Sequence, residues 1–234
     1  MYTNDNLNTF ILLHGRGSSA TKSGLALLSS TFTHDSNSTS TLRSTFPHAK
    51  FVFPTTTCSR ATLYKRSIIH QWFDSWDLTP RNEREAHARE WLMIDGLQLT
   101  TAYLRVLLWQ EVALVPGGAE SVVLYGLSRG CAASLMTMLL WDGESLAGVV
   151  GMCGWLPFAD GMVGVIASSG DGKGGREDDR VPLQSGSGSA ACLKAMGVKV
   201  SWDEYQGLGH WYSGGMLADI APFLQNSKDW TAEV

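Results

Sequence analysis

The stretch SVVLYGLSRGCAASLMTMLLW, residues 121–141, decides the fold of this chain. Its first five residues form an apolar run typical of a buried strand, and Cys131–Trp141 is an apolar run long enough for a helix. Gly126-Leu-Ser-Arg-Gly130 lies between them, so Ser128 stands where the strand turns sharply into the helix. Such a turn is either a plain helix cap or the position of a nucleophile.

Apolar runs and helical patterns alternate along the rest of the chain. Strands are predicted at Thr9–Leu13, Lys50–Thr55, Leu146–Cys153 and, with partial alternation, Val198–Tyr205. Helices are predicted at 82–109 and Gly215–Gln225, and an exposed Ser/Thr-rich loop is predicted at Ser29–Ser44. Apolar strands that alternate with helices indicate a parallel sheet covered on both faces. We therefore expect an α/β fold, with a mostly parallel central sheet and helices on both faces, in one domain spanning residues 1–234.

Composition narrows the choice of partners. Of the 234 residues, 44% are hydrophobic and 17% are charged, and the formal net charge is −4. Because no run rich in lysine or arginine occurs, a nucleic-acid partner is not expected. The first residues lack a signal-peptide pattern, and no apolar run reaches the roughly 18 residues that span a bilayer. We expect a cytoplasmic protein without stable membrane insertion.

A nucleophilic serine requires a base and an orienting carboxylate. In hydrolases that carry their serine on such a turn, the acid and then the histidine follow it along the chain. His210 is the only one of six histidines that follows Ser128, so it is the predicted base. Asp178 is the preferred acid, because the 32 residues up to His210 leave room for a helix and a strand. Asp171 and the neighbouring Asp179 remain alternatives.

Main-chain amides complete the predicted site. The sequence HGRGSS follows the first predicted strand, and its glycines let the backbone turn an N–H group toward Ser128. The helix that begins after Ser128 supplies a second N–H group at its N-terminus. We therefore expect the amides of Arg16 and Arg129 to form an oxyanion hole.

The chain resembles the acyl-protein thioesterase and phospholipase/carboxylesterase group of α/β-hydrolases. The matching pieces, in the family's order, are ILLHGRGSS, FVFPT, QWFDSWDL, VVLYGLSRG, GMCGWLP, DDRVP and YQGLGHWY. The resemblance implies an α/β-hydrolase fold with Ser128 as nucleophile, Asp178 as acid and His210 as base. It also implies apolar residues near the bound acyl group: Trp72, Phe73, Trp76, Trp155 and Leu156.

Two departures from the family pattern bear on function. Arg129 follows the serine where the family usually has glutamine, and a guanidinium beside the site would favour anionic substrates. A strand is expected at Met162–Ala167, but a long segment rich in glycine and charge separates it from Asp178. Two functions follow: a serine hydrolase, or a hydrolase-fold binding protein with little or no turnover because this segment is altered.

The expected hydrolase acts on carboxylic esters or thioesters through an acyl-serine intermediate and uses no metal or cofactor. Its substrate would be a small acyl ester or thioester, an acylated protein or a lysophospholipid. The sequence leaves open the choice between oxygen and sulfur esters, the acyl chain length and the oligomeric state.

Overall fold

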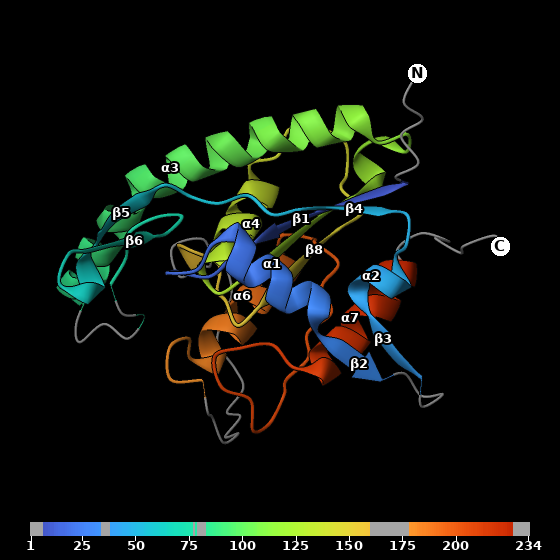
Figure 1. Cartoon of the computed structure of the whole chain (residues 1–234). Coiled ribbons are helices and arrows are strands. Elements are labelled where there is room, and N and C mark those ends of the chain that lie inside the picture. Colours follow the sequence, from blue (N-terminus) through green and yellow to red (C-terminus); the bar gives the residue numbers. More distant parts are fainter. Residues whose placement is uncertain (1–6, 34–37, 77, 79–82, 160–177, 227–234) are drawn as a thin grey trace.

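A four-stranded parallel sheet forms the centre of the molecule (Figure 1). The computed structural model describes residues 7–33, 38–76, 78, 83–159 and 178–226, without the side chains of 83–87, 89 and 226. In spatial order the strands are β4 (Ala49–Val52), β1 (Asn8–Leu13), β7 (Val122–Leu127) and β8 (Gly148–Met152), each parallel to its neighbour. The fold predicted from the sequence is therefore confirmed.

Side chains of the central strands alternate between two cores, as the period of a strand requires. On β1, Ile11 and Leu13 enter one core and Phe10 and Leu12 enter the other. On the first face lie α3 (Glu83–Leu114), α4 (Arg129–Leu139) and α6 (Leu183–Ala195). On the second face lie α1 (Ala20–Ser29), α2 (Leu42–Thr45) and α7 (Gly214–Asn226). Burial on both faces explains why β7 is apolar throughout.

The prediction of an exposed loop at Ser29–Ser44 is wrong for the residues that the structure describes in this range. A short antiparallel pair, β2 (Thr31–Thr33) and β3 (Thr39–Thr41), leads into α2. Phe32 is only 2% exposed and joins the core formed with α7. The composition of the segment is that of a loop, but one buried aromatic residue holds it against the body of the protein.

The strand predicted at Val198–Tyr205 is also wrong. These residues form no strand, and the Val198 amide instead donates to the carbonyl of Leu193, which closes the turn after α6. A strand needs a neighbour with which to pair, and β8 is the last strand of the sheet in the described part of the chain. Alternating residues alone cannot supply that neighbour.

A hairpin that the sequence analysis did not predict projects beside the sheet (Figure 1). It consists of β5 (Cys58–Ala61) and β6 (Ser67–His70), joined by the short 3₁₀ helix η1 (Thr62–Tyr64). A second 3₁₀ helix, η2 (Gly118–Ser121), leads into β7.

Other predicted boundaries shift by a few residues. The helix predicted at 82–109 extends to Leu114 and passes through Gly96, where a Cβ atom would lie 2.8 Å from that of Phe73. The helix after Ser128 begins at Arg129 rather than Cys131. The strand predicted at Met162–Ala167 lies outside the described residues. No helix in the described ranges is long and apolar enough to cross a membrane.

Candidate active site

Ser128 occupies a strained turn between β7 and α4. Its dihedral angles, φ 57° and ψ −117°, lie in a region that residues with a side chain rarely adopt. Two hydrogen bonds hold this conformation: the Ser128 amide donates to the carbonyl of Met152 at 2.8 Å, and the Ser128 carbonyl accepts from the Ala132 amide at 3.1 Å. The turn thus presents the hydroxyl at the carboxyl edge of the sheet, where ligands of open α/β folds bind.

Glycines on both sides of Ser128 permit this turn. A Cβ atom on Gly130 would lie 2.3 Å from the carbonyl oxygen of Leu13, and one on Gly126 would lie 2.3 Å from the backbone of Gly130. Real Cβ atoms do not approach backbone atoms so closely, so any other residue would push α4 away from β1 and β7. The glycine spacing therefore follows from the close packing of strand against helix.

The ring of His210 lies between Ser128 and Asp178. Its Nε2 atom is 2.8 Å from Ser128 Oγ, and its Nδ1 atom is 3.0 Å from both carboxylate oxygens of Asp178. The carboxylate favours the tautomer with the proton on Nδ1, so Nδ1–H donates to Asp178 and the serine hydroxyl donates to Nε2. The side chains of His210 and Asp178 are both mostly buried, with exposed fractions of 13% and 19%.

Two main-chain amides fix the position of the Asp178 carboxylate. The amides of Arg180 and Val181 both donate to Asp178 Oδ1 at 2.9 Å. The neighbouring Asp179 side chain is 87% exposed and faces Arg180 at 4.0 Å. Asp171 lies outside the described residues, so Asp178 is the carboxylate that reaches His210 within the described part of the chain.

The predicted oxyanion amides lie on either side of Ser128. Arg129 is the first residue of α4, and a Cβ atom on Gly15, which precedes Arg16, would be 3.5 Å from Ser128 Cβ. Within the described residues, neither the Arg16 amide nor the Arg129 amide donates a hydrogen bond. Both N–H groups therefore lack an acceptor among the described residues, and their role in an oxyanion hole stays a prediction.

His14 and Trp72 hold the turn that carries Arg16. His14 Nδ1–H donates to the carbonyl of Gly15 at 2.7 Å, and Trp72 Nε1–H donates to the carbonyl of His14 at 2.8 Å. His14 is only 1% exposed, and this burial lowers the pKa of its ring below the ordinary value, so the ring is neutral at neutral pH. This role of His14 was not predicted, because a histidine at the end of a strand carries no local signal for it.

The guanidinium of Arg129 does not face a substrate, contrary to the expectation that it would favour anionic substrates. The residue is 1% exposed, and its guanidinium donates to the side chain of Gln71, the carbonyl of Phe73 and both oxygens of Ser75. It also lies 5.1 Å from the centre of the Phe73 ring. The loop 71–75 offers carbonyl and hydroxyl acceptors in reach, and these replace the water that the buried charge has lost.

Ser75 also contacts the other predicted oxyanion residue. Arg16 Nη2 donates to Ser75 Oγ at 3.3 Å, while the Arg16 guanidinium lies 5.1 Å from the centre of the Tyr64 ring. Burial lowers the pKa of Arg16 to about 10, so the group stays charged at neutral pH. Ser75 therefore links the side chains of both residues whose amides flank Ser128.

The structure places four of the five predicted acyl-binding residues in the protein core. Exposed fractions are 5% for Trp72, 2% for Phe73, 7% for Trp155 and 2% for Leu156. All four belong to the core between the sheet, α3 and α4, where they pack behind the site. Trp76 is 42% exposed, so contact with a substrate remains a prediction for that residue.

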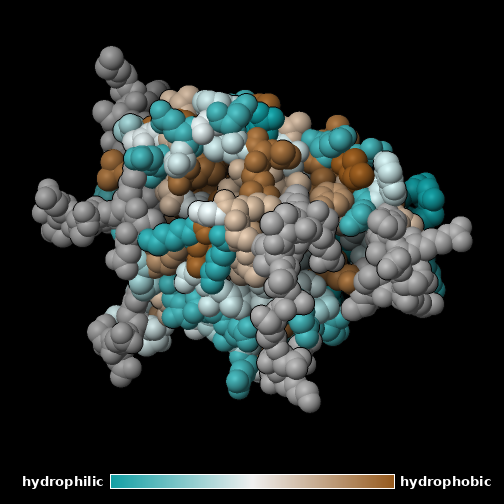
Figure 2. Space-filling view, turned by 180° about the vertical axis from the view of Figure 1, so that it is seen from behind, coloured by the Kyte–Doolittle hydropathy of each residue, from teal (hydrophilic) through white to brown (hydrophobic). Residues whose placement is uncertain are grey.

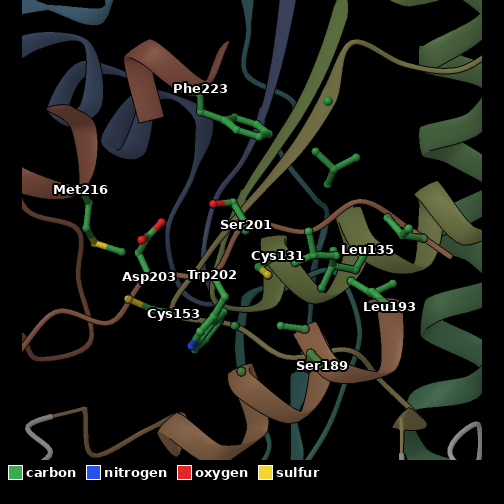
Figure 3. Close-up of a pocket in the computed structure, with 18 of the residues that line it drawn as sticks. Cys131, Leu135, Cys153, Ser189, Leu193, Ser201, Trp202, Asp203, Met216 and Phe223 are labelled. Atoms are coloured by element: carbon green, nitrogen blue, oxygen red, sulfur yellow. The ribbon is translucent and has the colours of Figure 1, made fainter. Parts of the chain in front are cut away.

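A cavity of about 1240 Å³ lies between β8, α4, α6 and the segment 198–209 (Figure 3). Its lining includes Cys131, Leu135, Leu193 and Trp202. Asp178 also lines it. Neither Ser128 nor His210 lines this cavity. A reacting carbonyl has to lie about 3 Å from the nucleophile, so this cavity is not the place where a bond to Ser128 would form.

The described residues contain no group of three His, Cys, Asp or Glu side chains arranged to hold a metal ion. A serine, an imidazole and a carboxylate in hydrogen-bond contact, with two free amides nearby, are the groups that acyl transfer requires.

The fold and this constellation define the class of α/β-hydrolases. The family model described as phospholipase/carboxylesterase matches residues 3–228, so the chain belongs to this family of esterase-like hydrolases, as its sequence motifs predicted. Acyl-protein thioesterase 1 of Gibberella zeae is 31% identical over 140 residues, which are 56% of this chain and 58% of that protein. Carboxylesterase SOBER1 of Arabidopsis thaliana is 26% identical over 188 residues, covering 76% of this chain and 77% of that protein.

Solved structures show the same fold. The crystal structure of Arabidopsis thaliana SOBER1 matches with a TM-score of 0.70 at 21% identity, covering 94% of this chain and 98% of that one. The crystal structure of Zea mays acyl-protein thioesterase 2 matches with a TM-score of 0.70 at 22% identity, covering 95% and 94%.

Proposed function

We propose that this protein is a serine hydrolase that cleaves carboxylic esters or thioesters through an acyl-serine intermediate. The observation that carries the proposal is the ring of His210, 2.8 Å from Ser128 Oγ on one side and 3.0 Å from the Asp178 carboxylate on the other. A hydroxyl becomes a nucleophile when an oriented base accepts its proton.

In the proposed reaction Ser128 Oγ attacks the carbonyl carbon while His210 Nε2 accepts the hydroxyl proton. Asp178 keeps the ring in the required tautomer and stabilises its charged form. His210 then returns the proton to the leaving alcohol or thiol, which leaves the acyl group on Ser128. A water molecule, deprotonated by His210, attacks this ester and releases the carboxylic acid.

The amides of Arg16 and Arg129 are proposed to bind the oxyanion of both tetrahedral intermediates. Loss of one such donor typically raises the barrier by about 3 kcal/mol. Their side chains support this role indirectly, since both guanidinium groups donate to Ser75 and so restrain the backbone on either side of Ser128.

The proposed substrate class is an acyl ester or thioester, including an acylated protein. The named relatives are acyl-protein thioesterases and a carboxylesterase. Three partly exposed apolar side chains belong to residues that contact Arg16 or stand next in the chain to such a residue, and they offer a surface for an acyl chain: Leu63, Tyr64 and Trp76, exposed by 38%, 43% and 42%. Tyr64 contacts the Arg16 guanidinium, and Trp76 follows Ser75 in the chain.

A fluorophosphonate probe tests the proposal, because it labels an activated serine and leaves an inert hydroxyl unmarked. We expect labelling of the wild type, no labelling of Ser128→Ala, and unchanged labelling of Ser145→Ala, which alters an exposed serine. Hydrolysis of p-nitrophenyl butyrate and of a butyryl thioester should follow the same order. A folded wild type that neither reacts with the probe nor hydrolyses either substrate would favour the binding-protein alternative.

A further inference from the structure

The outward face of α3 is apolar over most of its length. Eleven positions between residues 91 and 114 are exposed, and eight of them carry apolar side chains. The apolar positions are Trp91, Leu99, Ala102, Tyr103, Val106, Trp109, Ala113 and Leu114. We call these eight residues the outer band.

The outer band is not the face by which α3 packs on its own protein. That inner face is formed by Leu97, Leu104 and Leu108, which are 0–3% exposed. A helix on the surface of a globular protein normally turns polar residues to water, but here Trp91 is 74% and Leu99 is 75% exposed. In Figure 2 hydrophobic side chains, mixed with hydrophilic ones, are visible in the upper part of the view, the side on which α3 lies in Figure 1.

The outer band extends beyond α3 at one end. The rings of Trp109 and Trp141 lie 4.7 Å apart, and Leu140, next to Trp141, is 50% exposed. A continuous apolar patch of this kind, rather than single exposed residues, marks a binding surface.

The charges near the outer band argue against an anionic lipid surface as its partner. Arg105 binds Asp142, and Glu111 binds Lys50. Between residues 91 and 114 this leaves Asp95 as the one exposed charged side chain. Helices that lie on membranes carry lysine or arginine along their polar side, and this stretch of α3 has no such row.

We propose that the outer band binds a second copy of this chain, so that two α3 helices pack antiparallel in a symmetric dimer. Two helices can interlock when apolar residues recur at alternating spacings of three and four. This spacing occurs on α3 at positions 92, 95, 99, 102, 106, 109 and 113. Leucine, alanine, valine or tryptophan stands at all of them except Asp95.

A two-fold axis beside Ala102 and Tyr103 makes the outer band complementary to itself. Positions equally far from this axis face one another, so Trp91 lies opposite Leu114 and Leu99 lies opposite Val106. Asp95 lies opposite Gln110, so no two like charges meet. A symmetric interface uses the same patch on both copies and requires this kind of self-complementarity.

The size of the outer band suits a stable dimer. An α-helix rises 1.5 Å per residue, so residues 91–114 extend about 36 Å. A band about 10 Å wide then has a projected area of about 360 Å² on each copy, and interlocked side chains bury more surface than this projection, toward the ~800 Å² of a standard specific interface. Ser128 and His210 lie at the carboxyl edge of the sheet, outside the outer band, so the inference does not depend on the proposed reaction.

Sedimentation equilibrium of the full chain tests the inference. We expect a dimer at roughly 10 μM protein and a dissociation constant raised at least ~100-fold by Leu99→Glu or Val106→Glu, because a symmetric interface carries each change twice. Leu25→Glu alters a leucine that is 66% exposed on α1, and it should leave the dimer intact. A wild type that stays monomeric at about 100 μM, or a dimer that survives both α3 changes, would overturn the inference.

Crosslinking tests the antiparallel register. In a Cys58→Ser background, which removes the exposed native thiol, Ala102→Cys should be joined into a covalent dimer by a short bismaleimide. Leu25→Cys on α1 should not be joined, and neither should Trp91→Cys, because position 91 faces position 114 in the antiparallel pair but would face itself in a parallel pair. Crosslinking at Trp91, or at Leu25 but not at Ala102, would reject the register. Binding of a monomeric wild type to phosphatidylcholine vesicles, lost in Leu99→Glu, would replace the second copy with a lipid surface.

Discussion

Replacing Asp178 with asparagine tests the proposed acid, because the surrounding donors determine how the new side chain would orient. Oδ1 accepts from the amides of Arg180 and Val181 at 2.9 Å, and asparagine can keep both bonds only through its carbonyl oxygen. Its NH₂ group then takes the place of Oδ2, 3.0 Å from His210 Nδ1, and donates to that atom. Although Oδ1 also lies 3.0 Å from Nδ1, an N–H donor beside Nδ1 favours the tautomer with the proton on Nε2, and in that tautomer the ring cannot accept the proton of Ser128.

We expect this substitution to lower kcat about 10⁴-fold, the loss typical of a wrong histidine tautomer in such a site. That loss corresponds to about 5.4 kcal/mol of barrier, at 1.36 kcal/mol for each factor of ten. Since both backbone bonds remain, the free energy of unfolding should change by no more than about 1.5 kcal/mol.

The assay is the hydrolysis of p-nitrophenyl butyrate, with kcat and KM measured separately and stability followed by urea unfolding. Asp179→Asn is the matched control, because this neighbouring side chain is 87% exposed and does not contact His210. The reasoning fails if Asp178→Asn retains more than about a tenth of the wild-type kcat, or if Asp179→Asn loses as much.

Three further substitutions test the residues that support the candidate site. Gly130→Ala should prevent stable folding or abolish probe labelling, because its Cβ would lie 2.3 Å from the carbonyl oxygen of Leu13. The control is Gly188→Ala in α6, whose Cβ would meet open space; it should raise the free energy of unfolding by up to ~1 kcal/mol. Arg129→Met should cost about 3 kcal/mol in urea unfolding, because several buried oxygens lose their donor; an unchanged midpoint would contradict this. Burial lowers the pKa of His14 below 6.5, so the unfolded chain binds more protons below that pH. The free energy of unfolding should therefore fall from about pH 7.5 to 5.5, and less steeply in His14→Gln; equal slopes would rule this out.

Much of the fold could be predicted because its signals are local. β1 and β7 are apolar runs, and the turn between β7 and α4 carries its glycines in sequence. Two predictions failed where a distant partner decided the outcome. Residues 198–205 alternate like a strand but lack a neighbour, and Phe32 buries a segment whose composition is that of a loop.

The residues of the candidate site were also predicted only in part from the sequence. Chain order selected Ser128 and His210, and the structure brings them within hydrogen-bond distance. By spacing, the sequence favoured Asp178 but left Asp171 and Asp179 open as alternatives, because the choice depends on which carboxylate the folded chain turns toward the ring of His210. It also gave no indication that Ser75 connects Arg16 and Arg129 across the site.

The amino-acid sequence by itself determined the family, the parallel sheet and the sharp turn at Ser128, since these depend on neighbouring residues and on the order of motifs. Only the tertiary structure decided where side chains point. It turned the Arg129 guanidinium into the protein and placed most of the predicted acyl-binding residues in the core. It also left an apolar band facing outward on α3. Burial and contact depend on residues that are distant in the chain, and no local pattern contains them.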